Sequence, residues 1–258
     1  MKLAAAVVAT LASLATLAVC QAGDAAAAPP EQCQVPQSLL DTDADFSRVL
    51  KVFKTEHRIA ITVIGSGSSG LAGPDGAHAA YPARLEYVLK QLLPGSDIKV
   101  AAHVQSKETT AAMLSGLDKV LADDKPVLVI WQAGTVDALD GVEPDDFRDS
   151  LNDGVEKIQA AGADLILMNM QYSPRTESMF NISAYADVMR AIAEQHGALL
   201  FDRLAIMHYW NDAGAFDLYA ATKKYDMARR VHNCIGWALA SQVVNAARLD
   251  ATRIQTTQ

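Results

Sequence analysis

A buried apolar segment that leads directly into a turn of glycines and serines carries the clearest chemistry in this sequence. Residues 59–64 are almost all apolar and β-branched, which is typical of a strand buried on both faces, and residues 65–70 read Gly-Ser-Gly-Ser-Ser-Gly. Ligands of open α/β sheets bind where the strands end, near free N–H groups of the next helix. Ser66, or alternatively Ser68, could therefore act as a nucleophile, with N–H groups of the Gly65 turn stabilising an oxyanion. The alternative is a flexible strand-to-helix turn without chemistry.

Two residues near the C-terminus could supply the base and the acid that such a nucleophile needs. His232 would accept the serine proton and Asp226 would orient the imidazole, provided that the fold brings all three within hydrogen-bond reach. The two lie six positions apart, an offset that does not place them side by side on a helix, although a loop could. The alternative for His232 is a surface or capping histidine without a chemical role.

Two further residues are expected at the same edge because each follows a strand-like segment. Gly134 comes after residues 127–131 and could offer a backbone N–H to an oxyanion. Tyr172 comes after residues 165–170 and is expected to shape the rim of the site. Asp137 is either part of the site or a cap for the next helix. We expect Gly134, Tyr172 and the serine turn to line the principal pocket.

The segments that must position these residues alternate between short apolar runs and amphipathic stretches. Strands are expected at residues 59–64, 98–104, 127–131, 165–170 and 198–201. Helices are expected around residues 85–93, 113–121, 147–158, 183–196 and 225–247, where apolar residues recur at helical spacing. This alternation predicts one α/β domain, a three-layer α/β/α sandwich whose sheet has five parallel strands in the flavodoxin-like order.

With these motifs the sequence resembles the SGNH (GDSL-type) hydrolase family, from about Arg58 to Ala240. The resemblance lies in the strand order, the helix start at residues 81–85, the turn at residues 131–137 and the late histidine. It implies a serine hydrolase that acts on a small-molecule or glycan ester, with no metal and no cofactor. The alternative is a non-catalytic protein of the same fold that binds an acyl, glycan or protein ligand.

The motif blocks differ from those of the family. If Ser66 is the nucleophile, Gly65 stands in place of the aspartate of the Gly-Asp-Ser turn. If Gly65 instead matches the first glycine of that turn, the nucleophile position falls on Gly67. Val136 occupies the place of the asparagine that donates to the oxyanion, and Arg229 the place of the acid three residues before the histidine. The altered blocks favour the non-catalytic alternative, whereas the retained serines, Gly134 and the histidine favour the enzyme.

Composition excludes several classes of partner. The 258 residues are 50% hydrophobic and 20% charged, with a formal net charge of −8. Because there is no basic cluster, nucleic acid is not expected to bind. The cysteines and histidines lack the spacing of a metal site.

The N-terminus predicts export. Residues 1–28 combine one lysine, a short apolar run and small residues, which is typical of a secretory signal peptide, so we expect a secreted or periplasmic protein without a stable membrane span. Lipidation at Cys20 is an alternative. Removal of the signal leaves Cys33 and Cys234, which could form a disulfide or remain buried thiols. We expect an N-terminal arm at 29–57 and a hydrolase-like domain at 58–250.

Overall fold

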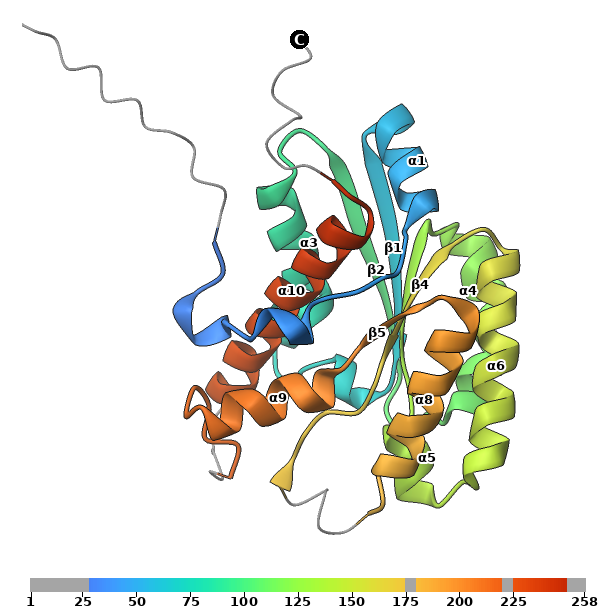
Figure 1. Ribbon diagram of the computed structural model, residues 1–258, viewed down its shortest axis with the longest axis vertical. Helices are drawn as coiled ribbons and strands as arrows, with labels where there is room; N and C mark the ends of the chain where they lie inside the picture. The colour runs from blue at the N-terminus through green and yellow to red at the C-terminus, as the bar shows by residue number, and fades with distance from the viewer. Residues whose placement is uncertain (1–27, 175–179, 220–224, 250–258) are drawn as a thin grey trace, which may run out of the picture.

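A five-stranded parallel sheet forms the centre of the molecule. The computed structural model describes residues 28–174, 180–219 and 225–249. The strands are β1 (Arg58–Gly65), β2 (Asp97–Val104), β3 (Leu128–Gln132), β4 (Asp164–Met168) and β5 (Leu199–Phe201), in the order β2-β1-β3-β4-β5 (Figure 1). This order confirms the predicted flavodoxin-like sheet. Because every strand runs in the same direction, the segments that follow the strands meet at one edge.

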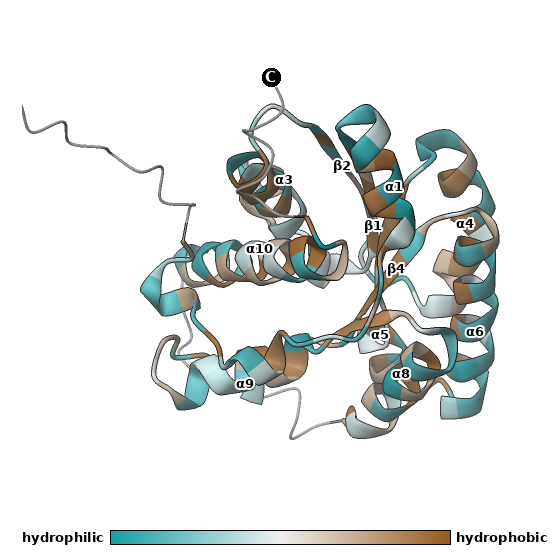
Figure 2. Cartoon of the chain, turned by 45° about the horizontal axis from the view of Figure 1, so that its top comes forward, coloured by the Kyte–Doolittle hydropathy of each residue, from teal (hydrophilic) through white to brown (hydrophobic). Residues whose placement is uncertain are grey.

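Helices cover both faces of the sheet and complete the predicted three layers. Figure 1 shows the first group beside one face: α3 (Tyr81–Leu92), α9 (Arg203–Asp212) and α10 (Asp226–Ala246). The opposite face is covered by α4 (Thr110–Asp124), α6 (Pro144–Ala160) and α8 (Ser183–His196). The outward faces of α6 and α8 are mostly hydrophilic (Figure 2). No helix in the described ranges is long and apolar enough to cross a membrane.

Successive side chains of each strand point to opposite faces of the sheet, so the apolar side chains form two hydrophobic cores, one on each face. In β1, Ile61 and Val63 lie in the core beneath α3 and α10, whereas Ile64 lies in the core beneath α4 and α6. In β3, Ile130 and Trp131 divide in the same way. Strands that are covered on both sides are therefore apolar throughout. This explains why β1 and β3 are visible in the sequence as apolar runs, whereas β2 at the edge of the sheet also contains Asp97, Lys99 and His103.

The predicted N-terminal arm is tied into the domain at several points. A disulfide joins Cys33, in the short helix η1 (Glu31–Cys33), to Cys234 of α10, which confirms the predicted pair. The arm also contains a helix that we did not predict, α1 (Ser47–Glu56). The Asp164 carboxylate at the start of β4 accepts hydrogen bonds from the backbone N–H groups of residues 48 and 49, at 3.1 and 2.9 Å, and so caps α1. This cap comes from a residue more than a hundred positions away.

The predicted signal peptide lies outside the described residues apart from residue 28. The other short elements follow β1 and β3: a 3₁₀ turn, η3 (Gly67–Ser69), the four-residue α2 (Gly76–Ala79), and α5 (Thr135–Asp140). Both η3 and α5 begin within three residues of a strand end. They place the serine turn and Gly134 at the same edge of the sheet, as predicted.

Candidate active site at the carboxyl edge of the sheet

The residues predicted to form the site follow three different strands at this edge. Ser66 comes directly after β1, Gly134 two residues after β3 and Tyr172 four residues after β4. Gln132, the last residue of β3, lies between them and is fully buried. Arg203 follows β5 and begins α9, and it too has no exposed surface. This edge therefore combines the serines of the turn, the amide of Gln132 and the buried guanidinium of Arg203.

Gln132 holds the serine turn together. Its side-chain oxygen accepts from the backbone N–H of Ser66 at 3.1 Å. The same oxygen lies 3.0, 3.1 and 3.2 Å from the hydroxyls of Ser66, Ser68 and Ser69. Since a carboxamide oxygen has two lone pairs, the hydroxyls compete for it. An amide is not a base, so this contact orients the serine protons but cannot remove one.

The exposed residue of the turn is a glycine, not a serine. Ser66 is only 2% exposed and its hydroxyl points to Gln132, whereas the exposed residue of the turn is Gly67. A Cβ atom at position 67 would lie 3.0 Å from the hydroxyl oxygen of Ser106, which is itself exposed after β2. The geometry therefore favours the register in which Gly67 takes the nucleophile position. That position carries no nucleophilic atom.

His232 is bonded in a way that differs from the predicted base. Its Nδ1 atom accepts the backbone N–H of Tyr81 at 3.0 Å, so the proton of the neutral ring resides on Nε2. In this tautomer neither ring nitrogen has a free lone pair for a serine proton. Burial, and to a smaller extent the nearby Arg203 cation, lower the pKa of His232 to about 3. The imidazole is therefore a neutral hydrogen-bond acceptor, and His232 as a whole is only 6% exposed.

Asp226 does not orient His232. Both residues belong to α10, with Asp226 at its first position. Six residues of helix correspond to a rise of about 9 Å, and they turn the two side chains to different faces. The two residues lie on the helix that the sequence predicts, and the loop that could have brought them together is not formed.

The predicted oxyanion donor at Gly134 is also engaged. Its N–H donates to the Asp137 carboxylate at 3.3 Å. Asp137 further accepts the N–H and the hydroxyl of Thr110, both at 2.9 Å, and thus links the first turns of α4 and α5. Asp137 is a cap, one of its two predicted roles. Gly134 has φ +87°, and a Cβ there would lie 2.8 Å from the Met170 sulfur, so glycine is required.

Arg203 and Tyr81 belong to the site but were not predicted as functional residues. Arg203 donates to the Ser68 carbonyl at 3.3 Å and to the Ser68 hydroxyl at 3.1 Å, while its Nε has no partner. No described carboxylate forms an ion pair with it, and burial lowers its pKa to about 10. The Tyr81 hydroxyl donates to Ser69 at 2.9 Å, and burial raises the pKa of Tyr81. The sequence did carry one signal for Arg203: it follows the last predicted strand and therefore lies at the same edge of the sheet as the other site residues.

Tyr172 lies at the edge but faces α9. It is 4% exposed, and its ring centroid lies 4.5 Å from that of His208. His208 Nδ1 lies 3.0 Å from an oxygen of Asp212, one helical turn further along α9. Tyr172 therefore fixes α9 against the segment after β4. Its predicted role in shaping the rim of the site stays a prediction.

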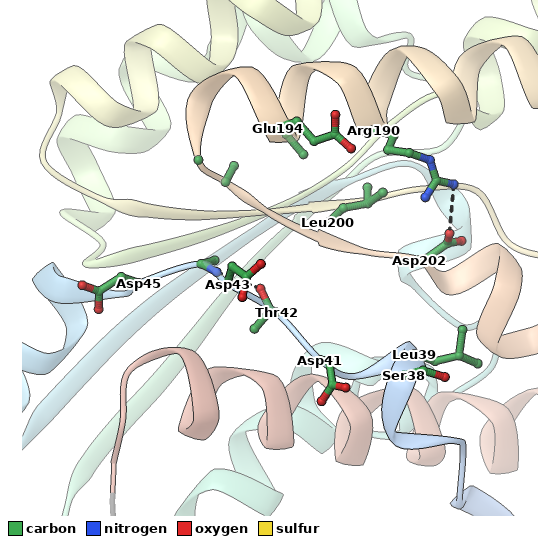
Figure 3. A pocket seen from close by; sticks show the side chains of 14 residues that line it. Ser38, Leu39, Asp41, Thr42, Asp43, Asp45, Arg190, Glu194, Leu200 and Asp202 are labelled. Carbon is green, nitrogen blue, oxygen red and sulfur yellow. Dashed lines mark hydrogen bonds and ion pairs between the residues drawn. The ribbon is translucent and has the colours of Figure 1, made fainter.

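A separate hollow of about 740 Å³ lies between residues 38–45 and α8 (Figure 3). Carboxylates line it, and Arg190 pairs with Asp202 at 3.3 Å. In the described part of the chain, no group of three or more metal-ligating side chains could hold an ion. This hollow does not include the serine turn. Another hollow, of about 650 Å³, reaches Ser69 and Gly70 of the turn but not Ser66, Gly134 or Tyr172, so the predicted principal pocket lined by these three residues stays a prediction.

Comparison with known proteins decides the family. Residues 32–249 match the model of the non-GDSL lipase-like family. The chain belongs to this family. This member of the non-GDSL lipase-like family is also 32% identical to esterase TesA of Pseudomonas aeruginosa over 106 residues, which cover 41% of this chain and 52% of TesA. The match thus spans about half the length of that relative.

Solved structures of SGNH-type esterases share the fold of this non-GDSL lipase-like protein. A catalytic mutant of the acetylxylan esterase Axe2 from Geobacillus stearothermophilus has a TM-score of 0.59 at 19% identity, over 76% of this chain and 96% of Axe2. The psychrotrophic esterase EstA from Pseudoalteromonas sp. has a TM-score of 0.56 at 21% identity, over 74% of this chain and 98% of EstA. At these identities the likeness establishes the SGNH hydrolase fold and leaves the chemistry to the residues of the site.

Proposed function

We propose that this chain is a non-catalytic SGNH-fold protein that binds a ligand at the carboxyl edge of the sheet without hydrolysing it. One observation carries the proposal: the exposed position of the serine turn is Gly67, while the buried Ser66 hydroxyl donates to Gln132. Attack on an ester carbonyl needs an accessible oxygen and a base that takes its proton. In the described structure Ser66 is buried, the partly exposed Ser68 hydroxyl is held by Gln132 and Arg203, and no base accepts a proton from either serine.

Ser68 and Arg203 support the proposal that this edge binds a ligand. Ser68 is the partly exposed serine of the turn, and its hydroxyl accepts from Arg203 while it donates to Gln132. Arg203 is a buried cation without a described carboxylate partner, which is costly unless other groups compensate for it. Because Arg203 has no exposed surface, a ligand would contact the partly exposed Ser68 hydroxyl, which Arg203 holds and polarises. An acyl, glycan or protein ligand could do so.

A second candidate is the serine ester hydrolase itself, favoured by the esterase relatives and by Ser66 at the end of β1. Ser66 would attack a small-molecule or glycan ester, and His232 would take its proton. For this to happen, His232 would have to release the Tyr81 N–H that it now accepts. No step would need a metal or a cofactor.

The two candidates differ in their response to a fluorophosphonate probe, which labels activated serines. We expect the purified protein to remain unlabelled and to leave activated acyl esters intact, at levels that Ser66→Ala, Ser68→Ala and His232→Ala do not change. An active SGNH esterase serves as the positive control. Stoichiometric labelling at Ser66 or Ser68 that is lost in His232→Ala would overturn the non-catalytic proposal and establish the hydrolase.

We further propose that the protein is exported to the periplasm or the cell exterior. The signal-like residues 1–28 motivate this proposal, and the Cys33–Cys234 disulfide supports it because disulfides persist in oxidising compartments. Mass measurement of the protein recovered outside the cytoplasm should reveal cleavage near residue 28. Recovery of the uncleaved chain from the cytoplasm would contradict export.

A further inference from the structure

The outer edge of β2 offers unpaired backbone groups. β2 is the first strand of the sheet and pairs only with β1. The N–H groups of Asp97 and Gln105 point toward β1, since they donate to the carbonyls of residues 57 and 65. The even-numbered residues of β2 must therefore direct their N–H and C=O groups outward. The Glu86 carboxylate accepts the Val100 N–H at 2.8 Å, whereas Ala102 and Val104 have no partner among the described residues.

A groove runs along this edge between β2 and α3. Its volume is about 650 Å³, and its lining includes Val100, Ala102 and Val104 from β2 and Pro82 and Tyr87 from α3. Val104 and Tyr87 are 36% and 49% exposed, so apolar surface lies open on both walls. An exposed strand edge beside apolar surface is a template for another extended chain. The groove thus presents both main-chain hydrogen-bonding groups and places for alternate side chains.

One end of the groove is cationic. Arg84 and His78 also line a second hollow of about 410 Å³, to which Arg229, Asn233 and Asp75 contribute. Asp75 lies 3.9 Å from Arg229 and offsets one of the two arginine charges, so Arg84 carries the charge that has no carboxylate partner among the described residues. Arg84 is held in place, because its Nε donates to Asn233 at 2.8 Å and its guanidinium lies 4.5 Å from the centre of the Tyr87 ring. Its two terminal nitrogens make no hydrogen bond within the described residues. They can each donate to a carboxylate.

We propose that this groove binds an extended peptide segment of a partner protein, which adds to β2 as a sixth strand and places an acidic side chain or carboxylate at Arg84 and Arg229. Main-chain pairing to Ala102 and Val104 provides the attachment, and the two arginines set direction and charge preference. A second copy of this chain fits less well, because it would bring a net charge of −8 and its own arginine pair to the same interface. The groove borders the serine turn at Ser69 and Gly70 but is not lined by Ser66 or Ser68, so the proposal holds whether or not these serines hydrolyse esters.

The test uses fluorescent synthetic peptides of alternating valine and threonine, and it measures binding to the purified protein by fluorescence anisotropy. A peptide that ends in two glutamates should bind at least about tenfold more tightly than its counterpart that ends in two lysines. The double variant Arg84→Gln/Arg229→Gln should lose this preference. Arg148→Gln on α6, another exposed arginine, is the matched control and should keep it.

N-methylation of the peptide separates strand pairing from apolar contact. In one version the methyl groups occupy odd positions and in the other even positions, so only one version blocks the N–H groups that face β2. One version should lose at least about tenfold in affinity and the other should bind as the parent does. Equal binding of both versions, equal binding of the acidic and basic peptides, or no binding of any peptide would each overturn the proposal. Ala102→Pro, which removes an outward N–H and leaves the β1 ladder intact, should weaken binding as the blocked version does.

Discussion

At the scale of single residues, hydrogen-bond direction decides the chemistry of the site more than residue identity does. Serine, histidine and aspartate are all present, yet Ser66 donates to an amide and His232 accepts a backbone N–H. In a Ser-His-Asp triad the imidazole instead donates through Nδ1 and accepts through Nε2. The sequence supplies the residue types but not these directions, because they depend on Tyr81, which is 151 positions away from His232.

The buried imidazole predicts a specific pH dependence of stability. The pKa of His232 is about 3 in the folded protein and about 6.5 in an unfolded chain. Above about pH 6.5 both states are neutral at this residue, so it has no effect. As the pH falls from about 6.5 to about 3, the unfolded state binds a proton that the folded state excludes, and this costs up to about 1.4 kcal/mol per pH unit.

Urea unfolding at about pH 7 and about pH 4.5 measures this loss. His232→Asn keeps an acceptor for the Tyr81 N–H but does not titrate, so its free energy of unfolding should fall less between the two pH values than that of the wild type. Every other titrating group is shared by the two proteins and cancels in the comparison. Equal losses would show that His232 is protonated in the folded state.

At the scale of elements, the sequence predicts what local patterns determine and misses what distant residues determine. The strands are apolar runs, and α8 begins and ends where its periodicity predicts, at Ser183 and His196. The unpredicted α1 is capped by the Asp164 carboxylate, and α9 begins with the buried Arg203. Neither contact has a signal in the neighbouring sequence. The same holds for Gln132, whose role depends on a turn 66 positions earlier.

Two helical glycines provide a matched test of packing between elements. A Cβ at Gly116 in α4 would meet nothing within 4 Å, whereas a Cβ at Gly154 in α6 would lie 2.2 Å from the buried Trp131 ring. Gly116→Ala should therefore stabilise the protein by about 0.5–1 kcal/mol, because alanine favours the helix. Gly154→Ala should destabilise it by about 1–3 kcal/mol, because α6 must move away from the sheet. Thermal unfolding of both variants checks the opposite signs, and a stabilising Gly154→Ala would contradict the close packing of α6 on β3.

At the scale of the whole molecule, the first and last parts of the chain hold each other in place. The Phe46 N–H donates to the Ala246 carbonyl at 3.0 Å, and the Trp210 indole donates to the Gln34 carbonyl at 3.2 Å. The Cys33–Cys234 disulfide adds a covalent link across 201 positions. Cys234 lies two residues after His232 in α10, the helix that packs on α3 beside the serine turn. The N-terminal segment thus supports the helices that close this face of the sheet.

Reduction of the disulfide should therefore lower global stability. Native disulfides contribute about 2–5 kcal/mol, and Cys33→Ala/Cys234→Ala should lower the free energy of unfolding by an amount in this range. Alkylation of the denatured full-length chain should modify one of its three cysteines before reduction, Cys20, and all three after it. A chain that lacks residues 1–28 should show none before reduction and two after it. Two reactive thiols in that unreduced shorter chain, or a double variant as stable as the wild type, would show that hydrogen bonds and packing hold the N-terminal segment without the covalent link.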